Sequence, residues 1–250
     1  MNLDSAALDQ TLESLKSSGF CCLPAILDSN EVIRIIEQLE LVLTAQSEGV
    51  LTSRDSAYGV RNLLQLWPEV VSLLQEPVLL SFLRSVLGPN FGLVRVLFFD
   101  KPPGRSWTLP WHRDRTIAVR SHEEVPAGFS NPTTKAGLPH LVAPEELLNQ
   151  MLTLRFSLDP MTEENGPLVV IPASHQSKHS ADSELAQMVD SMHTVFCEAG
   201  DVFVMRPLLA HSSLKSKPET ALRRRVLHFE ISGCPELPGK LQWQEYYSLG

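Results

Sequence analysis

Apolar positions recur every three or four residues through most of the first third of the chain, which predicts amphipathic helices. The pattern holds over residues 5–17, 29–45 and 67–87. Ser29 and Asn30 supply a capping residue ahead of the second stretch. The third stretch is typical of two short helices that are broken at Pro77 and closed by Gly88. Between the first two helices, the short apolar run GFCCLPAIL predicts a strand.

From residue 91 onward the apolar positions form short runs separated by turn residues, which is typical of strands. The runs are FGLVRVLFFD, TLPWHRDRTIAV, MLTLRFSLD, GPLVVIPAS, MHTVFCEA, GDVFVMRP and RRRVLHFEIS. Their number predicts a sandwich or a jelly roll. The dipeptide Asn165-Gly166 is a strong hairpin signal, and Ala199-Gly200-Asp201 indicates another tight turn.

Residues 121–150 do not follow the strand pattern, because they are rich in proline and glycine and too long for a hairpin loop. Insertions of this length commonly carry function or are disordered. A lid over a binding site and a surface loop without a role in chemistry both remain open. We expect one domain over residues 1–250, with a largely helical support at 1–90 and a β core at 91–235 that contains this insertion.

Composition and charge narrow the classes of partner. An apolar fraction of 43% in 250 residues is enough for one large core. A net charge of -8 gives no broad positive field for nucleic acid. The chain has no apolar run of about 18 residues and no basic-then-apolar start, which argues against a membrane span and a secretory signal. We expect a cytoplasmic protein with a small-molecule substrate; the sequence does not indicate an oligomeric state.

The four cysteines, Cys21, Cys22, Cys197 and Cys234, are too few and too irregularly spaced for a disulfide framework. They also lack the paired CxxC spacing of a structural zinc site. We predict that they are reduced, buried small residues.

A possible metal site begins with His112 and Asp114. Residues two apart on an extended strand face the same side, so this pair can offer an imidazole and a carboxylate to one ion while Arg113 points away. A second histidine from a distant strand would complete a facial set that leaves three positions of an octahedral iron(II) open for co-substrate, water and O2. His-x-Asp alone is a weak signal, so the downstream sequence decides.

The downstream stretch contains a histidine followed by an arginine cluster. His211 ends one β run, and residues 223–225 open the next. A dicarboxylate that chelates the metal through its keto acid end needs a cation at its far carboxylate, and guanidinium is a bidentate, permanently charged partner. The alternative is an exposed arginine triplet beside a buried histidine.

These linked motifs resemble the phytanoyl-CoA dioxygenase family of iron(II) and 2-oxoglutarate oxygenases. The resemblance runs from GFCCLPAIL through FFDKPPGRSWTLPWHRD and LDPMTEENGPLVVIPASH to GDVFVMRPLLAHSS and RRRVLHFE. It implies a mainly β fold with flanking α, a double-stranded β-helix of the cupin-like jelly-roll type, with the N-terminal helices packed on one sheet.

The resemblance also implies the ligands. His112, Asp114 and His211 match the family's metal ligands for Fe(II), and Arg224 matches the arginine that binds the 2-oxoglutarate carboxylate. The gap from His211 is a residue or two longer than usual, so Arg223 stays an alternative. Neighbours on a strand face opposite ways, so only one of the two arginines can be the ligand.

Other positions match the family more loosely. Ser213 corresponds to a hydroxyl donor to the same carboxylate, or is a structural turn serine. Arg155 corresponds to a side chain against the co-substrate; a basic group in such an apolar run needs a partner if buried. Arg61 corresponds to a basic position on a segment that reaches the site, or forms a surface salt bridge.

The roles of four further positions are open. Arg113 stands where the family prefers glutamine, with little effect expected on the metal. Trp107 and Trp111 wall the pocket or belong to the core, and His140 lines the entrance or is solvated.

The implied reaction is hydroxylation of a small-molecule metabolite with O2, releasing succinate and CO2. The carboxylate of Asp114 argues against a halogenase, because related halogenating enzymes lack it. A non-catalytic jelly-roll ligand-binding protein is the alternative from another class. A zinc hydrolase is a third, although zinc sites rarely leave three adjacent positions open. The sequence does not identify the substrate.

Overall fold

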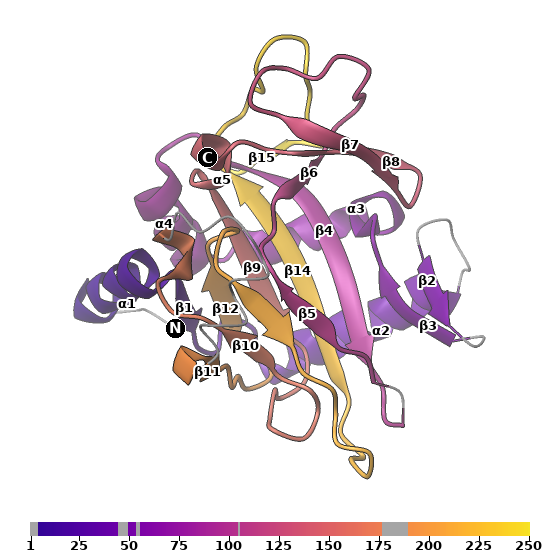
Figure 1. Ribbon diagram of the computed structural model, residues 1–250. Helices are drawn as coiled ribbons and strands as arrows, with labels where there is room; N and C mark the ends of the chain where they lie inside the picture. The colour runs from indigo at the N-terminus through magenta and orange to yellow at the C-terminus, as the bar shows by residue number, and fades with distance from the viewer. Residues whose placement is uncertain (1–4, 45–49, 54–55, 105, 177–189) are drawn as a thin grey trace.

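The computed structural model describes residues 5–44, 50–53, 56–104, 106–176 and 190–250, and its fold is mainly β (Figure 1). Its helices are α1 (Ser5–Ser18), α2 (Ser29–Thr44), α3 (Leu63–Leu66), η1 (Pro68–Leu74), α4 (Pro77–Leu87), α5 (Glu145–Leu148) and η2 (Ser174–Gln176). Its strands are β1 (Phe20–Leu23), β2 (Val50–Ser53), β3 (Ser56–Val60), β4 (Gly92–Lys101), β5 (Leu109–His112), β6 (Thr116–Ala118), β7 (Ser130–Lys135), β8 (Leu138–Val142), β9 (Met151–Ser157), β10 (Leu168–Val170), β11 (His193–Thr194), β12 (Val202–Met205), β13 (His211–Ser213), β14 (Arg224–Ser232) and β15 (Tyr247–Ser248). Residue 45, the last of the predicted second helix, lies outside the described residues.

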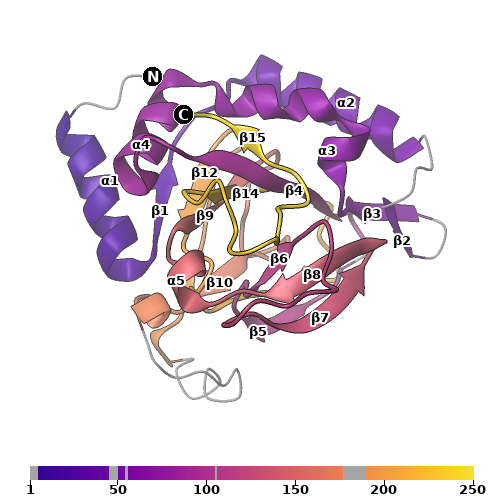
Figure 2. The ribbon, with the colours of Figure 1, turned by 90° about the horizontal axis from the view of Figure 1, so that it is seen from above.

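The strands of the described residues form three antiparallel sheets. The large sheet has the order β1-β12-β9-β14-β4-β3-β2, with β15 beside β4. The small sheet has the order β11-β10-β13-β5, and β6-β8-β7 form the third. Figure 2 shows α1, α2 and α4 on one side of the large sheet and β5, β6, β8 and β10 on the other. The predicted jelly roll with helices packed on one sheet is confirmed.

The central strands β4, β9 and β14 separate two environments by their alternation. On one face, Phe98, Phe156 and Phe229 are fully buried in the core shared with the helices. Burial of such a side chain contributes about 1.5–3 kcal/mol each. On the other face, the same strands present charged residues such as Arg95 and Arg224. The large sheet therefore carries the hydrophobic core on one side and polar chemistry on the other.

Helix α2 is capped by Asp28, not by Ser29 as its sequence suggests. The Asp28 carboxylate accepts hydrogen bonds from the backbone N–H groups of Asn30 and Glu31, both at 2.8 Å. The Glu31 carboxylate accepts one from the Asp28 N–H at 2.7 Å. This reciprocal arrangement is a capping box. Moving the cap by one residue leaves the apolar stripe of α2 unchanged.

The predicted helix pair at residues 67–87 is present, with one difference. The first member, η1, is a 3-10 helix, and α4 begins at Pro77 and is followed by Gly88 at a φ of +83°. Among the described residues, no single helix is long and apolar enough to cross a membrane. Only η1 and α4 taken together pass by length and composition, and they are bent by 82° relative to each other.

The hairpin predicted at Asn165-Gly166 is wrong, because the strands that flank it belong to different sheets. Strand β9 lies in the large sheet and β10 in the small one. The Asn165 side chain instead holds the connecting loop, donating to the carbonyls of Pro160 and Arg223. The turn predicted at residues 199–201 is present, with the Asp201 N–H donating to the Glu198 carbonyl.

The insertion at residues 121–150 is largely structured. Strands β7 and β8 pair with β6, and α5 follows them. Phe129, Leu141 and Leu147 pack into a second apolar cluster together with the C-terminal segment that contains Leu241 and Trp243. The insertion therefore has a core of its own.

The four cysteines are free, as predicted, but they are not all buried. Cys21 and Cys197 are buried, Cys234 is half-buried and Cys22 is exposed. Alternation explains the difference, because Cys21 and Cys22 are neighbours on β1 and face opposite sides.

Replacement of Asp28 by alanine is expected to lower the free energy of unfolding by about 1 kcal/mol, because two backbone N–H groups lose their acceptor. Asp28→Asn retains an acceptor oxygen and should cost less than half as much. Urea unfolding followed by circular dichroism measures both variants. Equal losses for alanine and asparagine would contradict the capping role.

Candidate active site

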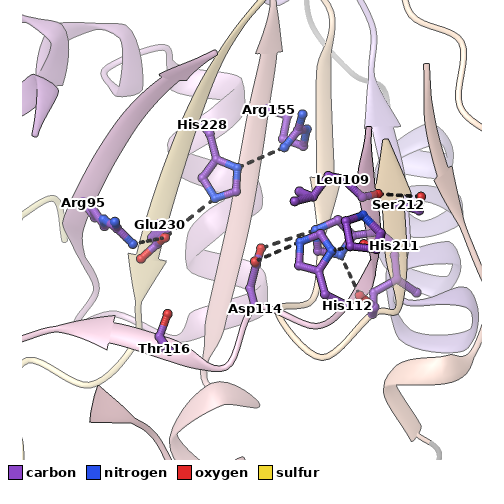
Figure 3. A network of polar contacts seen from close by, with 12 residues as sticks. Arg95, Leu109, His112, Asp114, Thr116, Arg155, His211, Ser212, His228 and Glu230 are labelled. Carbon is purple, nitrogen blue, oxygen red and sulfur yellow. Dashed lines mark hydrogen bonds and ion pairs between the residues drawn. The ribbon is translucent and has the colours of Figure 1, made fainter. Parts of the chain in front are cut away.

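A cavity of about 910 Å³ lies on the polar face of the large sheet. Residues from the large sheet and from the small sheet both line it, together with one residue of the insertion. The lining includes His112, Asp114, His211, Arg155, His228 and Trp107. Figure 3 shows the polar groups at its centre.

Two imidazoles and one carboxylate converge in this cavity. His112 and His211 are directly opposed partners in the antiparallel pairing of β5 and β13, and their ring centroids are 4.1 Å apart. The carboxylate oxygens of Asp114 lie 3.8 Å from His112 Nε2 and 3.7 Å from His211 Nε2. Pairing of the strands thus brings together residues that are about a hundred positions apart.

The sequence predicts that His112 and Asp114 share an extended strand, but in the structure Asp114 lies beyond the end of that strand. Strand β5 ends at His112, and β6 begins only at Thr116. The backbone N–H of Asp114 donates to the carbonyl of Pro207 at 2.9 Å, which fixes the connecting segment. The carboxylate reaches the two histidines by this route.

The tautomers of both histidines suit a metal ion. His112 Nδ1 lies 2.8 Å from the Pro110 carbonyl, and His211 Nδ1 lies 2.9 Å from the Leu209 carbonyl. A carbonyl only accepts, so both Nδ1 atoms carry the proton and both Nε2 lone pairs are free to bind. Asp114 Oδ2 is buried without a hydrogen bond. The ligand atoms of the three residues lie within 4.8 Å of one another.

The three side chains therefore fit an ion held by two histidines and one carboxylate. Metal–ligand bonds of about 2.1 Å at right angles put two facial ligands about 3.0 Å apart. The Nε2-to-carboxylate separations of 3.8 and 3.7 Å exceed this by less than about 1 Å, so small side-chain movements would close the set around an ion. This facial arrangement is typical of non-haem iron(II) centres.

Electrostatics keeps His211 and Asp114 deprotonated. Burial lowers the pKa of His211 to about 4, in spite of the nearby Asp114. Burial by itself would raise the pKa of Asp114, but the neighbouring imidazoles, His211 foremost, and the Arg155 guanidinium hold it below its usual value. Protons therefore compete little for these sites at neutral pH.

Arg113 points away from the ligands, as predicted. Its side chain is buried, and its Nε donates to the Leu208 carbonyl at 3.0 Å. Because Leu208 lies three residues before His211, this bond holds the loop that leads into β13.

Ser213 lines one end of the cavity, and Arg224 lies buried behind it and faces its hydroxyl. Its Nη2 donates to the Ser213 hydroxyl at 3.1 Å, and its Nε is buried without a hydrogen bond. Arg223 faces the other way, and its Nε donates to Asp100 at 2.9 Å. The alternation that was expected of these neighbours is present, and Arg224 is the one beside Ser213.

Lys101 is a second buried basic side chain at this end, and the sequence analysis did not predict it. It is opposite Arg224 in the pairing of β14 with β4, and its Nζ donates to the Ser213 hydroxyl at 2.8 Å. The Nζ also lies 4.6 Å from the centroid of the Trp107 ring. Among the described residues, neither cation forms an ion pair with a carboxylate. Burial, together with Arg224 and Arg155, lowers the pKa of Lys101 to about 6.

A lysine in FFDKPPG looks solvent-exposed, because it precedes a turn at the end of a strand. Alternation was the available signal: Arg95, Leu97, Phe99 and Lys101 share one face of β4.

A chain of polar contacts crosses the floor of the cavity beside Asp114 (Figure 3). Arg155 Nη1 donates to His228 Nδ1 at 3.1 Å. His228 Nε2 lies 3.8 Å from Glu230 Oε1, which accepts from Arg95 Nη1 at 3.3 Å. Burial, reinforced by Arg155, lowers the pKa of His228 to about 3, so this ring is neutral. Sequence reasoning assigned no role to His228 or Glu230, although both share a face of β14 with Arg224.

Some of the other residues discussed in the sequence analysis line the cavity, and others are buried in the core. Trp107, Arg155 and Arg61 line the cavity. Trp111 packs against the small cluster that contains Ala210. His140 is fully buried and not solvated, and its Nδ1 donates to the Leu138 carbonyl.

Comparison with known sequences gives one family. The sequence profile of the phytanoyl-CoA dioxygenase family matches residues 15–225. An uncharacterized protein of Mycobacterium tuberculosis is 23% identical over 216 residues, which cover 84% of this chain and 70% of that protein. A protein of Mycobacterium bovis matches to the same extent.

Solved structures share the fold. EctD from S. alaskensis, determined with 2-oxoglutarate and 5-hydroxyectoine, has a TM-score of 0.70 at 18% identity, covering 93% of this chain and 78% of its own. The α-ketoglutarate-dependent carbocyclase SnoK from nogalamycin biosynthesis has a TM-score of 0.67 at 16% identity, covering 92% and 84%. AviO1 from Streptomyces viridochromogenes has a TM-score of 0.66 at 23% identity, covering 96% and 99%.

Replacement of His211 by alanine is expected to weaken binding of a divalent metal ion by more than about 100-fold, because one of three ligands is lost. His193→Ala is the matched control, since that histidine is exposed and lies outside the cavity. Equilibrium dialysis with cobalt(II) measures both affinities. Metal binding that survives His211→Ala unchanged would place the ion elsewhere.

Proposed function

The chain belongs to the phytanoyl-CoA dioxygenase family, and we propose that it is an iron(II)- and 2-oxoglutarate-dependent oxygenase that hydroxylates a small-molecule metabolite. Family and fold support the 2-oxoglutarate-dependent oxygenase class. Hydroxylation, the substrate and the roles of individual residues are the further steps of the proposal.

One observation carries the proposal: two imidazoles with free Nε2 lone pairs and one carboxylate converge on a single point. His112, Asp114 and His211 would hold the iron and leave three adjacent positions for co-substrate, O2 and water. With iron(II) bound, such a centre couples O2 to the conversion of 2-oxoglutarate into succinate and CO2, with the second oxygen atom entering a C–H bond of the substrate.

The cations at one end of the cavity suit the far carboxylate of 2-oxoglutarate. Arg224 offers a fixed pair of donors, and its Nε has no hydrogen bond before an anion arrives. Lys101 becomes a second positive charge when an anion binds, and the Ser213 hydroxyl, which both side chains contact, is held between them. Burial beside Arg224 disfavours the charged form of Lys101, and an anionic co-substrate would offset that cost.

The side chains on the floor of the cavity would position the co-substrate and would not themselves react. His228 is neutral and receives a proton-donating contact from Arg155, so it presents Nε2–H toward Glu230. Arg155 lies close enough to Asp114 for its charge to lower the pKa of that carboxyl group. The hydrogen bonds of His112 and His211 are made at Nδ1, which leaves their Nε2 atoms available to a metal ion. The geometry supports Arg155 as a contact to the metal-bound end of the co-substrate.

Incubation with iron(II), 2-oxoglutarate and O2 is expected to release succinate, and His211→Ala is expected to release none above background. A screen of metabolites then identifies the substrate as the compound that raises succinate release. The product should gain one oxygen atom. The fold is shared with the carbocyclase SnoK and the epimerase SnoN. Loss of two hydrogens or an unchanged mass would therefore replace hydroxylation by ring closure or epimerisation.

A binding protein without turnover is separated from an enzyme by spectroscopy. Under argon, addition of 2-oxoglutarate to the iron-loaded protein should produce a visible charge-transfer band. Decay of this band on admission of O2 supports the oxygenase, and a band that persists in air indicates a binding protein.

Binding of 2-oxoglutarate is expected to take up a proton at Lys101. Without an anion, Lys101 is mostly neutral above its pKa of about 6. A carboxylate beside it raises that pKa, so the affinity for 2-oxoglutarate should fall as the pH rises from about 6 through the raised pKa. Calorimetry of the metal-loaded protein in buffers of different ionisation enthalpy measures the uptake.

Lys101→Met should abolish this uptake and weaken 2-oxoglutarate binding about tenfold, because a charged hydrogen-bond donor is lost. Lys215→Met is the control, because Lys215 lines the cavity but is exposed. Equal proton uptake by the wild type and Lys101→Met would assign the titration to another group.

A further inference from the structure

The cavity has a second charged end, beyond Asp114 and away from Arg224. Arg224, His228 and Glu230 share one face of β14. Glu230 is six residues from Arg224, so the two lie about 20 Å apart along the strand. In Figure 3, Arg95 and Glu230 lie on the side of Asp114 that is opposite His211. The metal ligands therefore stand between two separate polar regions.

Three cations gather at this second end, from three separate parts of the chain. Arg95 comes from β4, Lys135 from the end of β7, and Arg61 from the residue that follows β3. All three line the cavity. Lys135 donates from Nζ to the Thr116 hydroxyl at 3.1 Å. We call Arg61, Arg95 and Lys135 the cation cluster.

Within the described residues, Arg95 and Lys135 carry more positive charge than their carboxylate partners neutralise. Arg95 Nη1 forms an ion pair with Glu230, and Lys135 forms none with a described carboxylate. Asp114, the other carboxylate lining the cavity, belongs to the metal site. Burial, followed by the charges of Arg95 and Arg61, lowers the pKa of Lys135.

Arg95 also has an unfilled hydrogen bond. Its side chain is about nine-tenths buried, and its Nε is a buried donor without a partner. Such a donor is costly unless a ligand accepts from it.

We propose that the cation cluster binds an anionic group of the substrate, a carboxylate or a phosphate. The inference rests on the proposed function and deepens it, because it names the chemical class of the substrate. An anion held by Arg95, Lys135 and Arg61 would leave the remainder of the molecule facing the metal ligands. The reacting C–H bond would then lie on the Asp114 side of the site, and the co-substrate carboxylate would lie with Arg224.

The local charge contrasts with the whole chain, whose net charge is -8. General electrostatic attraction therefore does not bring anions to this protein, and a focused group of cations in a cavity does. Guanidinium and ammonium groups together bind carboxylates and phosphates through short, charge-assisted hydrogen bonds.

The test measures binding of simple anions to the iron- and 2-oxoglutarate-loaded protein under argon, so that the Arg224 end is already filled. The probes are inorganic sulfate, benzoate and benzamide, the last being the uncharged partner of benzoate. Calorimetry should show binding of sulfate or benzoate. Benzamide should bind at least about tenfold more weakly than benzoate, because it lacks the charge.

Two variants locate the binding. Lys135→Met and Arg61→Met should each weaken anion binding about tenfold. Lys240→Met is the matched control, because Lys240 is exposed, pairs with Glu124 at the surface and lies outside the cavity. It should change the affinity by less than about twofold. An intact 2-oxoglutarate band in each variant shows that the fold and the metal site are retained.

The outcomes of these titrations either support or overturn the proposed anion site. Tighter binding of sulfate than benzoate assigns a phosphate group to the substrate, and the reverse order assigns a carboxylate. Benzamide binding as tightly as benzoate, or anion binding that is unchanged in both cavity variants, overturns the proposal. Failure of the proposed function is seen separately, as absence of the 2-oxoglutarate band before any probe is added. Anion binding can be measured by the same titrations even if the protein releases no succinate.

Discussion

Strand alternation in β4, β9 and β14 is the constraint on which the remaining structure depends. One face must pack against the helices, so its residues are phenylalanine and leucine, as at Phe98 and Phe229. The other face is thereby released for polar groups, which a jelly roll shelters beneath its second sheet. Because these strands pair with each other over most of their length, a shift of one residue would exchange the two faces. Core packing thus sets the direction of every charged side chain in the cavity.

The small sheet makes the complementary contribution. Pairing of β5 with β13 sets His112 opposite His211, and the Ser212 hydroxyl ties the two strands by donating to the Leu109 carbonyl at 2.8 Å. Backbone carbonyls then fix the ring tautomers, so the binding geometry is prepared before an ion arrives. The polar groups of the large sheet face this centre across the cavity. Neither sheet alone contains a complete site.

The sequence predicted local features well and non-local pairings poorly. His112 and His211 could be found because each lies in a recognisable motif, and the helices because their apolar stripes are long. Alternation places Lys101 on the polar face of β4, but its position beside Arg224 could not be predicted, because that depends on how β4 pairs with β14. The hairpin signal at residues 165–166 failed for the same reason: the turn residues are right for a hairpin, but the flanking strands belong to different sheets. Periodicity describes a strand, while its partner is decided by the whole fold.

The insertion at residues 121–150 carries one member of the cation cluster on a small sheet with an apolar core of its own. Lys135 can therefore be exchanged without disturbing the packing that orients His112, Asp114 and His211. Under the proposal that the cation cluster binds the substrate, changes in this segment would alter substrate choice and leave those three side chains in place. Substrate choice and oxygen chemistry would in this sense be separately evolvable.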